Sequence, residues 1–209
     1  MRVRGLSSAL GRVPAVVVER ARSVGGLRWD VLCVYATALE AFEPIDDAPH
    51  DVTISVERVA DAPDLPAETA GTRPTDLVAI ARAHDPADAS TDGAIVGWAF
   101  ARVDSPVRVV ECVRQLVFEG AYLWGLFVES SARDRGVGVA LASALTGTVA
   151  RDRYGSAFAL IERSNARSRR VFERVGYGCV DETARVAVGG RRPPTGIVLG
   201  TRTYANRDS

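Results

Sequence analysis

The sequence contains no lysine, so all 26 of its basic residues are arginines. A Walker phosphate loop needs a lysine after its last glycine, and that class of nucleotide site is therefore excluded. Cysteine is scarce: Cys33, Cys112 and Cys179 are far apart and odd in number, which argues against a disulfide framework and against a cysteine metal site. The two histidines, His50 and His84, have no ligand-like neighbours, so we expect no metal.

Net charge and long apolar runs are also missing. The 26 basic and 26 acidic residues cancel, which gives no overall electrostatic argument for binding nucleic acid or an anionic membrane. No apolar run reaches the roughly 18 residues that a membrane span needs. Two of the first four residues are arginines, as at the start of a signal peptide, but the apolar stretch after them is interrupted too early by Arg12, Pro14, Glu19 and Arg20. We therefore expect a cytoplasmic protein.

The length of 209 residues and the hydrophobic share of 47% suit one domain with a substantial core and an appendage. Residues 1–50 are interpreted as a helical N-terminal extension. Within it, residues 6–24 suggest a helix that restarts at Pro14, and residues 29–42 suggest a second element packed on the main domain. Residues 51–205 are the predicted main domain, and residues 206–209 are a tail.

The main domain shows a mixture of strand and helix patterns. Strands are expected at residues 51–59, 93–103, 107–118, 121–128, 157–162, 178–188 and 196–204. Helices are expected at residues 75–82, from Gly138 to about Tyr154, and after Asn165. Elements in this order predict an α/β sandwich around a mixed sheet.

The first informative motif follows the apolar run Ala121–Val128. Arg133, Gly136 and Gly138 have the spacing Arg-x-x-Gly-x-Gly at the start of a predicted helix, and Val139 stands where a Walker loop has its lysine. The first turn of a helix has N–H groups without partners, and its dipole favours negative charge. Glycine has no Cβ, so a phosphate can approach the backbone closely. The motif therefore indicates a site for a phosphorylated cofactor, with an ordinary strand-to-helix turn as the alternative.

A second block follows the strand predicted at residues 157–162. This block has the features of a short helix. Asn165 can cap its start, Phe172 and Val175 lie on one face, and Gly176 can end it. Together the two blocks resemble the GCN5-related N-acetyltransferase (GNAT) superfamily. That family's signature is Arg/Gln-x-x-Gly-x-Gly/Ala, then a helix, a strand and an Asn-x-x-Ala/Ser-x-x-hydrophobic-Tyr block. The resemblance is specific over residues 121–177 and weaker over residues 52–204.

This resemblance implies a fold and a cosubstrate. The fold is an α/β, mostly antiparallel mixed sheet with helices on both faces, splayed between the fourth and fifth strands of the main domain, residues 121–128 and 157–162. The cosubstrate is acetyl-CoA or another acyl-CoA, without a metal. Its pantetheine arm would lie in the splay, and its pyrophosphate on the backbone amides of the glycine motif. The cofactor-binding residues that the resemblance implies are Leu126, Phe127, Val128, Arg133, Asp134, Arg135, Gly136, Val137, Gly138, Val139, Asn165, Ser168 and Phe172.

The implied reaction is direct attack of a primary amine on the thioester in a ternary complex. Acyl transfer to an amine needs a group that takes the amine proton and a donor that stabilises the carbonyl oxygen. The backbone N–H of Val128 is the expected oxyanion donor. Glu162, at the end of a strand that leads to Asn165, is the hypothesised general base, and Glu111 and Glu119 are alternatives.

The sequence departs from the family pattern at Phe172. Relatives have a tyrosine general acid at this position, and a phenyl ring cannot donate a proton. The thiol of CoA has a pKa of roughly 8.5, so its thiolate is a tolerable leaving group without an acid. Tyr122 and Tyr177 are alternative donors, although each also fits a packing role.

Two other functions stay open at this point. One is a non-catalytic acyl-CoA-binding or regulatory domain, which Phe172 favours. The other is an interaction protein whose function lies in residues 1–50. An acyl-CoA and an amine acceptor are the expected partners, nucleic acid is not, and a homodimer is left open. The acceptor itself has no recognisable signature in the sequence.

Overall fold

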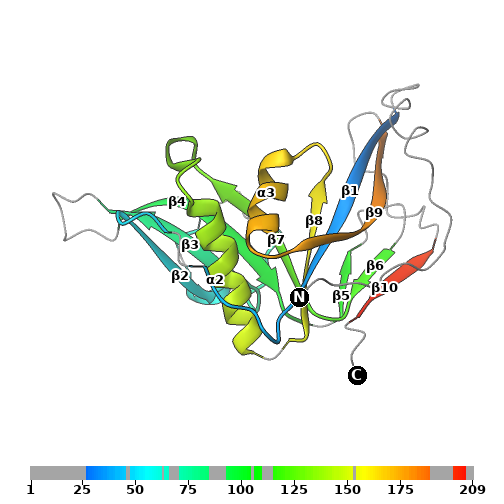
Figure 1. Cartoon of the computed structure of the whole chain (residues 1–209), viewed down its shortest axis with the longest axis horizontal. Coiled ribbons are helices and arrows are strands. Elements are labelled where there is room, and N and C mark those ends of the chain that lie inside the picture. The colour runs from blue at the N-terminus through cyan, green and yellow to red at the C-terminus, as the bar shows by residue number, and fades with distance from the viewer. Residues whose placement is uncertain are drawn as a thin grey trace.

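The computed structural model describes residues 27–45, 48–62, 64–65, 71–84, 93–104, 106–109, 115–152, 154–188 and 200–205. Its main body is a seven-stranded sheet with the strand order β2-β3-β4-β7-β8-β1-β9 (Figure 1). The strands are β1 (Leu27–Ala38), β2 (Val52–Arg58), β3 (Leu77–Ala83), β4 (Ala94–Arg102), β7 (Ala121–Val128), β8 (Ser156–Glu162) and β9 (Gly178–Val188). β7 and β8 run parallel, and the other neighbouring strands of this sheet are antiparallel.

A smaller sheet and two helices complete the described structure. The small sheet consists of β5 (Val107–Val109), β6 (Gln115–Phe118) and β10 (Thr201–Tyr204), with β6 in the middle. The helices are α2 (Val137–Arg151) and α3 (Ala166–Arg174), and two 3-10 turns are η1 (Val59–Asp61) and η2 (Ser130–Ala132). Among the described residues, no helix has the length and apolarity of a membrane span.

Apolar side chains cover both faces of the large sheet. On one face, Leu141 of α2 and Phe172 of α3 belong to one cluster with residues from β1, β3, β4, β7 and β8. On the other face, Phe118 of the small sheet packs with Phe158, and Phe100 packs in a separate cluster with residues near η1. The mixed, mostly antiparallel sheet confirms the predicted fold class. One detail differs within the described residues: their two helices, α2 and α3, both pack on one face, whereas helices were expected on both.

Residues 27–38 belong to the sheet, where an extension was predicted. β1 lies between β8 and β9 and pairs with both strands. Leu32 and Val34 are buried on one face, and Cys33 and Tyr35 on the other. A strand buried on both faces lacks the polar alternation that marks a strand in a sequence. Residues 27–38 are therefore part of the main domain, although the boundary was predicted near residue 50. The helix predicted at residues 6–24 lies outside the described residues.

Three other predicted elements also differ from the structure. The helix predicted at residues 75–82 is the strand β3, because its continuous apolar run is buried on both sides and has no period that separates strand from helix. The single strand predicted at residues 107–118 is a pair, β5 and β6, joined in antiparallel register. The last predicted strand, at residues 196–204, is β10, which joins β6 in the small sheet.

A buried ion pair holds the start of β3. Asp76 is fully buried, and its carboxylate accepts hydrogen bonds from Arg102 Nε at 3.0 Å, Arg102 Nη2 at 2.8 Å and the backbone N–H of Arg73 at 2.9 Å. Removal of one partner from such a pair leaves the other charge uncompensated, which costs roughly 3–5 kcal/mol. We expect Asp76→Ala to lower the free energy of unfolding in urea by about 3 kcal/mol.

Asp104 provides the matched control. Its carboxylate lies 3.9 Å from Arg73 Nη1, and its side chain is 52% exposed. Exposed ion pairs contribute less than about 1 kcal/mol, so Asp104→Ala should change the free energy of unfolding much less. Equal losses in the two variants would contradict a special role for the buried carboxylate.

Candidate active site

The site begins where β7 and β8 separate. The two strands pair only from Ala121 opposite Ala157 to Leu123 opposite Ala159. Beyond these positions β7 continues along β4, and β8 continues along β1 as far as Glu162. The gap that results is the splay predicted between residues 121–128 and 157–162. In this gap, backbone N–H and C=O groups of β7 and β8 that do not pair with each other can bind a ligand.

A β-bulge in β7 lies at the start of this gap. Phe100 of β4 is opposite Trp124, but Trp98 is opposite Phe127, so β7 has one extra residue at this point. Gly125 has a φ of 65°, a left-handed conformation that suits glycine. Because of the extra residue, Leu126 packs on the helix side of the sheet and Phe127 on the opposite side.

The backbone of Val128 faces the gap. The N–H of the next residue, Glu129, donates to the carbonyl of Val96 in β4 at 2.8 Å. Antiparallel strands alternate between residues that bond to the partner and residues that bond away from it, so the polar groups of Val128 point away from β4. The carbonyl of Val128 accepts a hydrogen bond from Arg133 Nε at 2.9 Å. Its N–H is likewise directed away from β4, toward the side on which β8 lies.

The first turn of α2 is open to an anion. The N-cap is Gly136, with a φ of 90°, and no side chain caps the helix. Gly138 lies in that turn, and a Cβ built on it would be 3.4 Å from Val171 Cγ2 and 3.7 Å from Val128 Cγ2. The start of α2 therefore meets the end of β7 and the helix α3. Uncapped N–H groups at a helix start suit a phosphate.

The two arginines of this turn have different partners. Arg133 bonds to the backbone of Val128, whereas Arg135 bonds to both carboxylate oxygens of Asp51, at 2.6 and 2.8 Å. The hydrogen bond from Arg135 lowers the pKa of the Asp51 carboxyl. Arg135 is thus engaged at the surface near β2, and the backbone of the turn is the better candidate for binding an anion. Asp134 is exposed and has a φ of 59°.

Helix α3 brings polar and apolar side chains to the gap. Asn165 Oδ1 accepts a hydrogen bond from the backbone N–H of Ser168 at 3.1 Å, which is the cap predicted from the sequence. Phe172 is buried and packs edge-on against Tyr177, with ring centroids 5.1 Å apart. The hydroxyl of Tyr177 lies 2.9 Å from Thr146 Oγ1, and burial raises the pKa of this phenol. Tyr177 is therefore a packing residue and is poorly placed to donate a proton.

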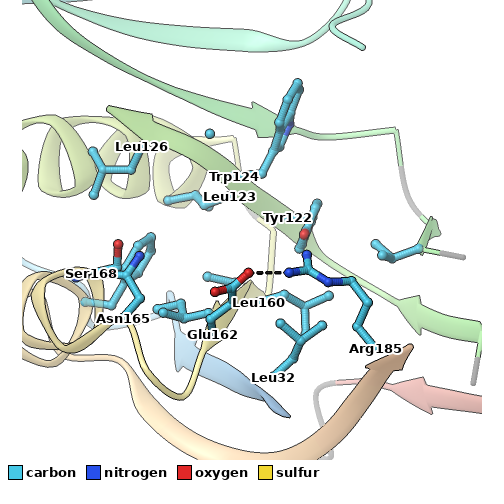
Figure 2. Close-up of a pocket in the computed structure, with 15 residues that line it drawn as sticks. Leu32, Tyr122, Leu123, Trp124, Leu126, Leu160, Glu162, Asn165, Ser168 and Arg185 are labelled. Atoms are coloured by element: carbon cyan, nitrogen blue, oxygen red, sulfur yellow. Dashed lines mark hydrogen bonds and ion pairs between the residues drawn. The ribbon is translucent and has the colours of Figure 1, made fainter. Parts of the chain in front are cut away.

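A cleft of about 260 Å³ occupies the splay (Figure 2). Five residues of the predicted site line it: Leu126, Glu162, Asn165, Ser168 and Phe172. The lining does not include the remaining predicted residues, which are Phe127, Val128 and residues 133–139. These residues belong to the end of β7, the turn before α2 and the first turn of α2. Glu119 does not line it either, and Glu111 lies outside the described residues.

Arg185 of β9 is the main feature of the cleft that sequence reasoning missed. Its guanidinium Nη2 bonds to Glu162 Oε1 and, at 3.1 Å, to Asp30 Oδ2 of β1. Figure 2 shows Glu162 and Arg185 pointing toward each other in the cleft wall. Although burial favours the neutral form, hydrogen bonds to the two carboxylates raise the pKa of Arg185. No local signal in the sequence could reveal this group, because its partners come from strands far apart in the chain.

Other lining residues were also missed, notably Leu32, Trp124 and Leu160, whereas Tyr122 had been considered as a proton donor. Leu32 escaped notice because its segment was placed outside the main domain. Within the described residues, no group of three or more His, Cys, Asp or Glu side chains is arranged to hold a metal ion.

Comparisons with known proteins point to one superfamily. Residues 106–186 match the model of the FR47-like protein family, which is related to GNAT proteins. No curated protein matches the chain. Among solved structures, a Drosophila protein matches with 21% identity, over 82% of this chain and 55% of its own, with a TM-score of 0.55.

Two further structures carry the superfamily name. A GCN5-related N-acetyltransferase from Sphaerobacter thermophilus matches with 17% identity, over 90% of this chain and 60% of its own, with a TM-score of 0.52. A GCN5-related N-acetyltransferase-like protein from Streptococcus suis matches with 13% identity, over 85% of this chain and 68% of its own, with a TM-score of 0.53. The chain thus spans little more than half the length of the first two, and at these identities the likeness concerns the fold.

Proposed function

Because the chain has the fold of the GCN5-related N-acetyltransferase superfamily, we propose that it is an acyl-CoA-dependent N-acyltransferase, most simply one that moves acetyl to a primary amine. One observation supports the proposal most: the parallel strands β7 and β8 separate beyond Leu123 and Ala159, and the cleft between them is lined by the carboxylate of Glu162. The helix that follows β7 also begins without a side-chain cap. Backbone groups and an anion site suit a cosubstrate that is long, amide-rich and phosphorylated.

The residues proposed to hold the acyl-CoA fall into three sets. The backbone of Leu126, Phe127 and Val128 would bind the pantetheine arm along the open edge of β7. The amides of residues 134–139 would bind the pyrophosphate, with Arg133 beside them. Asn165, Ser168 and Phe172 would line the other side of the arm. The position of Gly138 fits this assignment, because a side chain there would begin in contact with Val128 and Val171 and would project into the space beside the first turn of α2.

The chemistry follows from the two groups at the gap. A bound acyl-CoA supplies the acyl group as a thioester, whose C–S bond breaks as the new C–N bond forms. The N–H of Val128 donates a hydrogen bond to the carbonyl oxygen as negative charge develops on it. Glu162 accepts the proton that the attacking amine must lose, through the oxygen that Arg185 does not bond. Phe172 supplies no proton, so the sulfur departs as a thiolate, which a thiol pKa of roughly 8.5 permits.

Thermal stability with acetyl-CoA tests this proposal most directly. A ligand present at about a hundred times its dissociation constant stabilises the folded state by about 2.7 kcal/mol. For a chain of this size, we expect the melting temperature to rise by roughly 5–10 °C. No rise with saturating acetyl-CoA or with longer acyl-CoAs would contradict an acyl-CoA enzyme.

Phe172 favours a second candidate, a domain that binds acyl-CoA without turnover. Restoring tyrosine distinguishes the two. We expect Phe172→Tyr to retain or raise kcat, measured as release of free CoA thiol, because acid assistance is worth about a hundredfold or more. If neither protein turns over although both bind acetyl-CoA, the binding domain is the better description.

A further inference from the structure

Two charged side chains lie in the wall of the cleft, on the sheet face opposite the helices. Along β8, Phe158 and Leu160 pack with the small sheet, and Ile161 packs with the helix-side cluster. Glu162 continues the first series and therefore faces the small-sheet side, where Arg185 bonds to it. The acyl-CoA of our proposal binds at the end of β7 and the start of α2, which leaves the small-sheet side of the cleft for the acceptor.

The charges of this wall cancel. Glu162 and Arg185 are the charged residues among the described residues that line the cleft, and they bond directly to each other. An acceptor with a single charge would face one member of the pair with a like charge, whereas an acceptor with both charges can place each beside its opposite. Because the two groups are in contact, the charges of the acceptor must also be close together. An ammonium and a carboxylate on one carbon atom meet this condition.

The guanidinium of Arg185 has donors left for a carboxylate. Its bonds to Glu162 and to Asp30 of β1 both start from Nη2, and Nη1 and Nε donate to no described residue. Among the described side chains, the polar atoms that are both unpaired and inaccessible belong to Trp124 and Arg169, so the unpaired nitrogens of Arg185 reach solvent. The two bonds at Nη2 hold the guanidinium in place, which favours recognition of a carboxylate by its planar donors.

The rest of the lining on this side is mostly apolar. Leu32, Val109 and Leu160 line the cleft and belong to the apolar cluster that the small sheet forms with the large one. An apolar group buried against these side chains gains free energy, whereas a charged group would lose its hydration there without a partner.

We infer that the acceptor is a free α-amino acid with an apolar side chain. This inference rests on the proposed acyltransferase function. Arg185 binds the carboxylate, Glu162 faces the amine, and the apolar lining contacts the side chain. The ammonium first loses one proton to water. The amine then attacks the thioester, its second proton passes to Glu162, and the C–N bond forms as the C–S bond breaks, which gives an N-acyl amino acid and the CoA thiolate.

Matched acceptors test the inference with the full chain and acetyl-CoA. Phenylalanine and phenethylamine differ by one carboxylate, and phenylalaninamide keeps the size of the amino acid without its negative charge. We expect kcat/KM for phenylalanine to exceed both other values by about 10- to 100-fold, the effect of a hydrogen bond to a charged group. Equal or better turnover of phenethylamine or of the amide would overturn the inference and leave the acyltransferase function standing.

Other outcomes are also decisive. Leucine should be a better acceptor than aspartate, which has a similar size and a charged side chain, and the reverse order would contradict the apolar subsite. If acetyl-CoA binds but no amino acid is acetylated, the inferred acceptor class is wrong, whereas acyl-CoA binding stands. If acetyl-CoA neither raises the melting temperature nor shows binding heat, the acyltransferase proposal fails and the inference fails with it.

Variants of Arg185 separate carboxylate binding from a role in holding Glu162. Arg185→Gln keeps a donor for Glu162 but removes the charge, so the preference for phenylalanine over phenethylamine should fall by about tenfold or more, and Arg185→Lys should retain part of it. If Arg185 only held Glu162, kcat would fall equally for both acceptors and the unchanged preference would overturn the inference. Arg163→Gln is the control, since Arg163 pairs with Glu182 at 2.9 Å and does not line the cleft. The melting temperature with acetyl-CoA reports the fold of each variant.

Discussion

Gly138→Asp is expected to lower the affinity for acetyl-CoA by about a hundredfold, because two unit charges a few ångströms apart interact by several kcal/mol. The new carboxylate would occupy the anion position at the start of α2 and accept hydrogen bonds from the same N–H groups. The fold should survive. A Cβ at this position makes ordinary contacts, the nearest at 3.4 Å, and an acidic residue in a first turn stabilises a helix by about 0.3–1 kcal/mol.

Isothermal titration calorimetry measures the affinity, and the melting temperature without ligand reports the fold. Gly138→Ala is the matched control, because it adds the Cβ without the charge and should retain most of the affinity. An unchanged affinity in a folded Gly138→Asp protein would show that the phosphates bind elsewhere. A large loss in the alanine variant would show that space at Gly138, and not charge, limits binding.

Glu162→Gln is expected to lower kcat by about a hundredfold or more, the usual effect of removing a general base. The glutamine oxygen can still accept a hydrogen bond from Arg185, so the wall of the cleft keeps its arrangement. The amide cannot take a proton from the amine. Acetyl-CoA binds on the other side of the gap in our proposal, and its affinity should change by less than about twofold, because no hydrogen bond to it is lost.

Steady-state kinetics with a fixed amine and calorimetry with acetyl-CoA measure the two quantities separately. Glu182→Gln serves as the control, because Glu182 is a half-exposed carboxylate that pairs with Arg163 and does not line the cleft. Loss of acetyl-CoA binding in Glu162→Gln would contradict the role of general base. If Glu162→Gln and Glu182→Gln lowered kcat equally, the loss would come from the overall charge of this region and not from a general base at Glu162.

The part of the site that the sequence predicts is the part built from local signals. Residues 121–128 form β7 as predicted, α2 begins at Val137, and Asn165 caps α3. An apolar run, a glycine turn and a capping residue each act within a few positions, so they can be interpreted without knowing which segments meet. The splay between β7 and β8 was not predicted from local signals. It was predicted only through the family resemblance that the two motifs carry.

The other wall of the cleft depends on contacts between distant segments. β1 was assigned to an extension because burial on both faces removes its alternation. Without β1 in the sheet, nothing in the sequence places Asp30 beside Arg185 or Leu32 beside Glu162. The direction of the Val128 N–H was expected only through the family resemblance, since it depends on the register between β7 and β4.

The position of β1 also bears on how the protein folds as it is synthesised. Strands β2, β3, β4 and β7 form a meander of neighbours that can assemble in order as the chain emerges. β1 emerges before them, yet both of its partners come much later, and its contact between Asp30 and Arg185 spans 155 residues. β1 therefore has no neighbouring strand of the large sheet until β8 and β9 have been synthesised. Its pairing with them then closes a long loop, which is slow. The side of the cleft that contains Glu162 and Arg185 is then the last part of the large sheet to form, after the strands that precede the glycine turn.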